Sequence, residues 1–267
     1  MKKMIVVDLD NSLLNSKTEC EENSQNYLQE LKNKGYTIVI ATGRSLSSAI
    51  RVTDGACFAN YIISSSGSMI FDNDNKQIIF DKTLDNSEIQ KLYVEYKDFF
   101  TEFIFCDGNN YYKYHPIKEL SYFEEEIKDV LTFLETYPNL KHMSLDVKDI
   151  GKIYELRDKL NKEFTNLHFI VMQDSLASSK WLDVLCCNVT KYKAITFLSK
   201  LVGIKNEDII AFGDGLNDIE MISNCGVGVA MGNALEEVKE KALYETLSCD
   251  NEGIISFLKE YLNNEKI

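Results

Sequence analysis

The stretch MIVVDLDNS, residues 4–12, sets the pattern from which the fold of this 267-residue chain is predicted. Met4 to Val7 is a short apolar run, typical of a strand that is buried in a parallel sheet. Asp8 and Asp10 follow directly, at the end of the strand where open α/β sheets place their ligand crevice. Acidic pairs at strand ends are also common turn formers, so this pair alone does not identify a site.

Outward from this strand, short apolar runs alternate with helical patterns, as in a doubly wound α/β sheet flanked by helices. The predicted strands are 4–7, 36–41, 61–64, 209–212 and 227–230, with helices at 24–34, 46–52 and 190–201 and a hairpin at 69–71 and 78–80. This part of the chain is therefore predicted to form a doubly wound, parallel-sheet (Rossmann-like) core.

The alternation breaks after about residue 81 and resumes near residue 188. The intervening pattern predicts a helix at 87–97, a hairpin at 102–106 and 111–115, a helix at 118–135, a strand at 141–147, a helix at 150–164 and strands at 168–172 and 181–185. We therefore predict a core made of residues 1–81 and 188–267, interrupted by an inserted α+β cap domain at 82–187.

Composition limits the classes of partner. The formal charge of −13 argues against a nucleic-acid partner, because phosphate backbones attract basic surfaces. No apolar run approaches the ~18 residues needed to span a bilayer, and the N-terminus lacks the features of a signal peptide. The seven cysteines contain no C-x-x-C pair and are expected to be reduced. These features predict a cytoplasmic protein with no membrane partner.

Two further segments carry candidate site residues. Thr42, Gly43 and Arg44 follow the predicted strand 36–41, where a hydroxyl, a glycine and the start of a helix can bind a phosphate oxygen. The same three residues also fit an ordinary capped helix start. Lys191 begins an amphipathic helix, and a lone lysine there is typical of a solvated surface charge.

The segment AFGDGLNDIEMI, residues 211–222, is the most specific of the four. A strand ends in a glycine-rich turn that carries Asp214, Asn217 and Asp218, and a helix follows. Glycines let a backbone approach a ligand closely. Asp214 and Asp218 can converge with Asp8 on a hard cation, which prefers carboxylate and carbonyl oxygens.

In this order, the four segments resemble the haloacid dehalogenase superfamily, specifically its Cof-type branch (subfamily IIB) with a C2-type cap between the second and third motifs. The resemblance runs the length of the chain and includes GVGVAMGNA, residues 226–234, where Asn233 and Glu236 also predict a capping-box-like helix start. It implies a Mg²⁺-dependent phosphatase that hydrolyses a small phosphate monoester, such as a sugar phosphate or related metabolite.

The resemblance also implies residue roles. Asp8 matches the nucleophile that becomes an aspartyl-phosphate, and Asp10 matches the general acid and base. Thr42 and Lys191 match the groups that hold the phosphoryl oxygens. A carboxylate and a phosphate dianion repel each other, so magnesium and Lys191 would supply the positive charge that lets Asp8 attack.

The same resemblance implies a metal site. Asp214 matches the metal-ligating carboxylate, and Asp8 and the backbone carbonyl of Asp10 complete the set. Asp218 and Asn217 are expected to support the metal and the phosphate.

The chain departs from the family pattern at three positions near the motifs. Asn11 and Ser12 stand where glycine and threonine are usual, and Asn is among the few non-glycine residues that tolerate positive φ. Tyr192 replaces a glycine after Lys191 and is expected to narrow the approach to the site. Ser66-Gly67-Ser68 replaces asparagine-glycine-alanine.

In the cap, a loop is the expected substrate contact. Ser178-Ser179-Lys180-Trp181 precedes the strand that returns to the core. A set of aromatic residues is instead expected to form the cap's own hydrophobic core, and His115 to be a hairpin or surface residue. The aromatic residues are Phe99, Phe100, Phe103, Phe105, Tyr111, Tyr112 and Tyr114.

Two alternatives remain open at this stage. A phosphotransferase or mutase would use the same intermediate, and a non-catalytic phosphate-binding module would keep the fold without the reaction. The second requires a lost catalytic residue, yet Asp8, Asp10, Lys191 and Asp214 are all present. The expected partner is a small phosphorylated metabolite, and the protein is expected to be a monomer or a small homo-oligomer.

Overall fold

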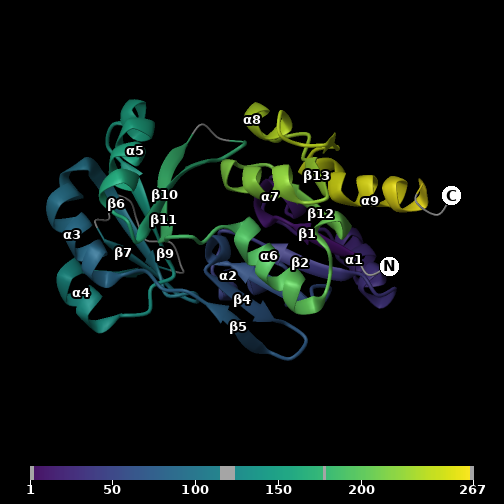
Figure 1. The fold of residues 1–267 in the computed structure, drawn as a ribbon, viewed down its shortest axis with the longest axis horizontal. Coiled ribbons are helices and arrows are strands. Elements are labelled where there is room, and N and C mark those ends of the chain that lie inside the picture. Colours follow the sequence, from purple (N-terminus) through teal and green to yellow (C-terminus); the bar gives the residue numbers. More distant parts are fainter. Residues whose placement is uncertain (1–2, 115–123, 177–178, 265–267) are drawn as a thin grey trace.

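Two β-sheets, each with its own hydrophobic core, organise the chain (Figure 1). The computed structural model describes residues 3–114, 124–176 and 179–264. Within these residues, no helix is both long enough and apolar enough to cross a bilayer. The architecture is the predicted α/β type, with a Rossmann-like core and a cap that carries the second sheet.

The larger sheet forms the core and is parallel at its centre. β1 pairs in parallel with β12 on one side and β2 on the other, whereas β4 and β5 form an antiparallel edge. In spatial order its described strands are β14 (Tyr244–Glu245), β13 (Val227–Ala230), β12 (Ile209–Gly213), β1 (Met4–Val7), β2 (Thr37–Ala41), β3 (Tyr61–Ser64), β4 (Met69–Asp72) and β5 (Gln77–Asp81). All four residues of β1 are buried, as expected for a central parallel strand.

Helices pack against this sheet and fill its hydrophobic core. They are α1 (Glu22–Asn33), α2 (Leu46–Val52), α6 (Lys191–Val202), α7 (Ile219–Asn224), α8 (Glu236–Lys239) and α9 (Gly253–Asn264). Ser45 caps α2 and Thr190 caps α6 through their hydroxyls, which accept backbone N–H groups of Ser48 and Lys193. These caps place the N-termini of both helices at the carboxyl edge of the sheet.

The smaller sheet belongs to the cap, which lies beside the core in Figure 1. Its described strands, in spatial order, are β10 (Leu167–Gln173), β11 (Lys180–Cys186), β9 (His142–Val147), β6 (Phe100–Cys106), β7 (Tyr111–Tyr114) and β8 (Glu124–Glu126). The cap helices are α3 (Asn86–Tyr96), α4 (Val130–Thr136) and α5 (Ile153–Glu163). Met143, Leu145 and Val147 of β9 join the apolar core of the cap, so the alternate residues of that strand face the other way.

Two local predictions are wrong. Within the described part of the segment 118–135, residues 124–126 form β8, which pairs in parallel with β7, and the helix covers only Val130–Thr136. Residues 115–123, including His115, lie outside the described residues. Lys113 of β7 forms ion pairs with Glu102 and Glu124, so tertiary pairing overrides the local helical pattern.

The predicted capping box at Asn233 and Glu236 is the second error. Leu235 is the residue that precedes α8, and it makes no side-chain cap. Asn233 instead accepts the backbone N–H of Cys249 and donates to the backbone carbonyl of Asn11. Its side chain therefore joins the C-terminal part of the chain to the turn after β1.

The aromatic residues of the cap divide into two groups. Phe100, Phe103, Phe105 and Tyr112 are buried in the cap core, as predicted. Phe99 is exposed, and Tyr111 accepts the backbone N–H of Ser45 through its hydroxyl. Tyr111 thus contacts the core rather than the interior of the cap.

Candidate active site

The carboxyl ends of β1, β2 and β12 bring the predicted site residues to one edge of the larger sheet. Asp8 directly follows β1, Thr42 follows β2 and Asp214 follows β12. These strands are neighbours in the parallel sheet, so residues that lie far apart in the sequence become adjacent. Lys191 is the first residue of α6, the helix with which the chain re-enters the core after the cap.

Lys191 is the centre of a buried charge network. Its Nζ donates to Oδ1 of Asp8 at 2.6 Å and to Oδ1 of Asp218 at 2.7 Å. Burial by itself lowers the pKa of Lys191, but the carboxylates of Asp218 and Asp8 outweigh it and raise the pKa above its ordinary value. The lysine is therefore a fixed cation, and not the solvated surface charge that is usual for a lone lysine.

The loop before α6 is shaped by a close backbone approach. Gly67 has a φ of +106°, and a Cβ there would lie 2.4 Å from the carbonyl oxygen of Thr190. Only glycine fits this contact, which holds the Ser66-Gly67-Ser68 turn against the residue before Lys191.

Asp218 organises the glycine-rich turn. Its Oδ2 accepts the backbone N–H groups of Asp214 and Gly215 at 3.1 and 3.0 Å, while its Oδ1 binds Lys191. A Cβ on Gly213 would collide with the Asp218 side chain, at 2.5 Å from Cγ. Asp218 thus connects the turn to the lysine.

Asp8, Asp214 and Asp218 form an acidic cluster that could hold a metal ion, with potential ligand atoms all within 4.8 Å of one another. Burial raises the pKa of Asp214 to about 7, and the neighbouring Asp218 adds to the shift. Burial also raises the pKa of Asp8 well above its usual value, although Lys191 opposes this. Three buried carboxylates face one lysine, so the cluster has an excess of negative charge that a cation would offset.

Ser12 supports this cluster. Its Oγ donates to Oδ1 of Asp214 at 3.0 Å, so the serine that replaces the usual threonine keeps a working hydroxyl. Asn11 adopts a φ of 56°, which confirms the expectation that Asn serves at a position that is usually glycine. Tyr192 packs against the hydrophobic core of the larger sheet. It is not among the described residues that line the cavity over Asp8, so the expected narrowing of the approach is not seen.

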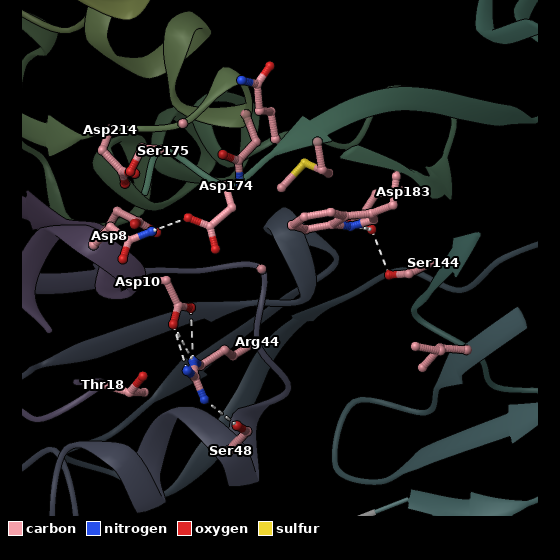
Figure 2. A pocket seen from close by; sticks show the side chains of 18 of the residues that line it. Asp8, Asp10, Thr18, Arg44, Ser48, Ser144, Asp174, Ser175, Asp183 and Asp214 are labelled. Atoms are coloured by element: carbon pink, nitrogen blue, oxygen red, sulfur yellow. Dashed lines mark hydrogen bonds and ion pairs between the residues drawn. The ribbon is translucent and has the colours of Figure 1, made fainter. Parts of the chain in front are cut away.

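Arg44 and Asp10 form an ion pair beside the cluster (Figure 2). Nη2 of Arg44 lies 2.6 Å from Oδ1 of Asp10, and Nε lies 2.9 Å from Oδ2. Nη1 donates to Ser48. The structure therefore places Arg44, which was predicted to bind phosphate, on the carboxylate of Asp10.

The rest of the Thr42 motif lies close by. Thr42 is fully buried and accepts the backbone N–H of Arg44 through Oγ1, while Gly43 and Arg44 line the cavity above. Thr42 thus closes a local turn, and the helix that follows is capped by Ser45 and not by one of these three residues. Asn217 also lines that cavity.

A cavity of about 640 Å³ lies between the core and the cap and contains Asp8, Asp10 and Asp214 in its wall. The sequence analysis missed a loop that reaches into it from the cap, at Asp174, Ser175 and Leu176. Of the predicted contact loop, residue 178 lies outside the described residues and Trp181 lines the cavity. The prediction was thus close in sequence but did not identify the residues that reach the core.

This cap loop is held onto the core by polar contacts. Nδ2 of Asn11 donates to Oδ1 of Asp174 at 3.1 Å. The side chain of Ser175 lies close to Asp214 (Figure 2) and opposes the rise in the pKa of that carboxyl. Asn233 donates to Ser175 at 3.4 Å. Asp174 and Ser175 of the cap thus contact the core beside the acidic cluster, which gives the cap a closed position over it.

The chain matches the haloacid dehalogenase-like hydrolase family over residues 5–258. It is 28% identical to the Bacillus subtilis 5-amino-6-(5-phospho-D-ribitylamino)uracil phosphatase YcsE, with 97% of this chain and 96% of the relative covered. It is 26% identical to the putative phosphatase YxeH of the same organism, over 97% of this chain and 98% of the relative. A solved haloacid dehalogenase-like hydrolase from Bacteroides thetaiotaomicron superposes with a TM-score of 0.81 at 26% identity, covering 98% and 100% of the two chains.

A parallel sheet with an acidic cluster at its strand ends, beneath an inserted cap, is the architecture of a capped hydrolase. The chain belongs to the haloacid dehalogenase-like hydrolase family, and the Cof-type resemblance predicted from its motifs is confirmed. It is an enzyme and, like these relatives, a phosphatase.

Proposed function

We propose that this phosphatase is Mg²⁺-dependent and hydrolyses a small phosphate monoester through an aspartyl-phosphate on Asp8. The observation that carries the proposal is the contact between Asp8 and Lys191, 2.6 Å long and buried at the end of β1. A carboxylate that shares its site with a fixed cation can approach a phosphate dianion, since the cation offsets the repulsion.

The acidic cluster fits a divalent cation. Asp8 and Asp214 offer carboxylate oxygens, which are the ligands that Mg²⁺ prefers, and the backbone carbonyl of Asp10 is the third proposed ligand. Asp218 already uses both oxygens within the protein, so its proposed part is to support this site. When bound, Mg²⁺ supplies positive charge to the phosphoryl group.

In this proposal, a carboxylate oxygen of Asp8 forms a bond to phosphorus while the bond from phosphorus to the leaving oxygen breaks. Asp10 gives a proton to the departing oxygen. It then takes a proton from the water that attacks phosphorus, and this second step releases phosphate and restores the Asp8 carboxylate. Lys191, with Thr42, Gly43 and Asn217 nearby, stabilises or orients the phosphoryl oxygens. Arg44 positions Asp10.

The substrate is proposed to be a small phosphorylated metabolite, such as a sugar phosphate, because a cavity of about 640 Å³ is of the size that holds a small molecule. The relative YcsE is named for 5-amino-6-(5-phospho-D-ribitylamino)uracil, which makes that compound a reasonable first substrate to assay. We further propose a cytoplasmic protein, a monomer or a small homo-oligomer, with no nucleic-acid or membrane partner.

A phosphatase panel with and without Mg²⁺ tests this function. The native chain is expected to release phosphate only with the metal, and Asp8→Asn to lower kcat by more than about a thousandfold. Asp158→Asn, an exposed acid on α5, is the matched control and is expected to retain native activity. Equal activity of native protein and Asp8→Asn would show that Asp8 is not the nucleophile. Breakdown of the substrate ester that requires an added acceptor alcohol, with the phosphoryl group recovered as a new ester and not as free phosphate, would favour a phosphotransferase instead.

A further inference from the structure

The cap sheet presents a polar face to the cavity. His142, Ser144 and Asp146 alternate along β9 with the apolar residues that fill the cap core, and all three line the cavity. Asp183 and Trp181 of β11 line it as well. The register pairs Asp183 directly with Ser144, so one row of side chains runs across this sheet above Asp8.

Asp183 is the buried anion of this face. It is only 4% exposed, and its Oδ1 accepts Ser144 Oγ at 2.6 Å and Trp181 Nε1 at 3.0 Å (Figure 2). Among the described residues, no hydrogen bond reaches Oδ2 and no cation forms an ion pair with this carboxylate. A buried carboxylate is costly unless it is paired, so a ligand that donates to Oδ2 would stabilise it.

His142 is a second, independent observation on the same face. It is 4% exposed, and its Nδ1 has no hydrogen-bond partner among the described residues. The centroid of its ring lies 6.2 Å from that of Tyr111, another residue of the cavity wall. Buried polar atoms in proteins are nearly always hydrogen-bonded, so an orphan nitrogen in a cavity wall indicates a missing partner.

The arginines and the carboxylates of the cavity wall are unevenly distributed over its two sides. The cap contributes the carboxylates of Asp146, Asp174 and Asp183, together with Glu124. The arginines of the wall, Arg44 and Arg51, both come from the core, and Arg44 is paired with Asp10. The core side also holds Asp8, Asp10 and Asp214, but Lys191, Arg44 and the proposed metal offset their charge, so an anionic phosphate suits that side. On the cap side Glu124 is paired with Lys113, whereas Asp183 has no ion pair among the described residues, so a second anion would meet its carboxylate.

We propose that Asp183 is a specificity-determining residue that accepts a hydrogen bond from a hydroxyl or amino group of the leaving group. Ser144 and Trp181 hold its carboxylate in place, and His142 offers a second polar contact. The enzyme consequently prefers phosphate esters of polyols or amino alcohols and rejects those that carry a second anionic group. This inference rests on the proposed phosphatase function and names the substrate class for it.

Three open-chain esters of six carbons test the preference in the native protein: glucitol 6-phosphate, 1-amino-1-deoxyglucitol 6-phosphate and 6-phosphogluconate. They place a hydroxyl, an ammonium or a carboxylate far from the phosphate. The kcat/KM for each of the first two is expected to exceed that for the third by at least about tenfold. The better of the first two identifies the donor. Equal or faster hydrolysis of 6-phosphogluconate would overturn the proposal.

Asp183→Asn then tests the residue, since an amide keeps the shape but places a donor at the former Oδ2. The preference for the first two esters over 6-phosphogluconate is expected to fall by roughly 10- to 100-fold. Asp158→Asn, on the outer helix α5, should keep the native preference. An unchanged preference in Asp183→Asn would contradict the assignment.

Binding to the native protein provides a measurement that does not need a folded variant or turnover. Trp181 is the single tryptophan of the chain and hydrogen-bonds to Asp183, so its fluorescence reports on this face of the cavity. Glucitol or 1-amino-1-deoxyglucitol is expected to change the emission at lower concentrations than gluconate. If no ester is hydrolysed but this order of binding is found, the proposed function fails while the specificity assignment stands. If esters are hydrolysed and gluconate binds equally well, only the specificity assignment fails.

Discussion

The guanidinium of Arg44 donates hydrogen bonds to both carboxylate oxygens of Asp10, from Nη2 to Oδ1 at 2.6 Å and from Nε to Oδ2 at 2.9 Å. In Figure 2 this carboxylate points to Arg44, on the side of the site away from Asp214. The residue proposed to protonate the leaving group is thus positioned by an arginine that follows a different strand. Proton transfer from Asp10 requires this ion pair to loosen once the substrate is bound.

Arg44→Ala should impair the protonation of the leaving group more than substrate binding, because it removes the side chain that positions Asp10. With a poor alkoxide leaving group, kcat is expected to fall by roughly 10- to 100-fold, the effect of losing a charge-assisted pair. With p-nitrophenyl phosphate, whose leaving group needs little protonation, the fall in kcat should be smaller. Steady-state kinetics on both esters provides the comparison. An equal loss on both, with a raised KM, would instead assign Arg44 to phosphate binding.

Lys191→Met should destabilise the fold because it leaves Asp8 and Asp218 buried without their cation. Breaking a buried pair in this way costs about 3–5 kcal/mol. Urea unfolding in the presence of a chelator measures the free energy of unfolding. Lys193→Met, an exposed lysine on the same helix, is the matched control and should change it by less than about 0.5 kcal/mol. Similar losses of the free energy of unfolding in both variants would show that the Lys191 network does not stabilise the fold.

Asn11→Gly should weaken the closed position of the cap. Glycine accepts the φ of 56° at this position, so the change removes the hydrogen bond to Asp174 and keeps the backbone. A net loss of about 0.5–1.5 kcal/mol lowers the ratio of closed to open molecules by roughly 2- to 10-fold. Acrylamide quenching of Trp181 fluorescence should rise accordingly.

A double-mutant cycle with Asp174→Ala separates this contact from the general effect of a glycine on the unfolded chain. The second change should have little further effect on quenching in the Asn11→Gly background. Additive effects of the two changes would mean that the side chains do not act together.

His142 should make stability depend on pH in mild acid. Burial lowers its pKa below the usual value, although Asp183 opposes the shift. Below about pH 6.5 the unfolded chain therefore binds a proton that the folded protein does not, and the stability present above that pH is lost as the pH falls. The loss can reach about 1.4 kcal/mol for each unit of pH between 6.5 and the folded pKa.

Urea unfolding of native protein and His142→Asn at pH 7.5 and pH 5.5 checks the slope. Between pH 7.5 and pH 5.5, the free energy of unfolding should fall more for the native protein than for His142→Asn. Parallel behaviour at both pH values would show that His142 is as easily protonated in the fold as in the unfolded chain.

Much of the core could be predicted from the sequence. β1 and β3 occupy the predicted residues, and α2 begins and ends where expected. These elements are short apolar or amphipathic runs whose type depends mainly on local pattern. The prediction of a helix across 118–135 failed where Glu124 pairs with Lys113, because the pairing of two strands depends on contacts that the local pattern of one segment does not show.

The residues gathered at the sheet edge were also predictable. Asp8, Thr42 and Asp214 each follow a predicted strand, and adjacent parallel strands end at one edge of the sheet. Alternation along β9 and β11 was a usable signal for the polar face of the cap. It indicated which residues share a face, although not that this face looks onto Asp8.

The sequence by itself thus determined the family, the order along the chain of the motifs that follow strands, and the convergence of Asp8 with Asp214. Those features follow from local periodicity and from the geometry of a parallel sheet. Only the tertiary structure decided that Arg44 holds Asp10, that Asn11 binds Asp174 and that Asp183 faces the cavity. The local sequence around these residues does not show which side chains come into contact, because that depends on how the strands pack side by side and how the cap packs on the core.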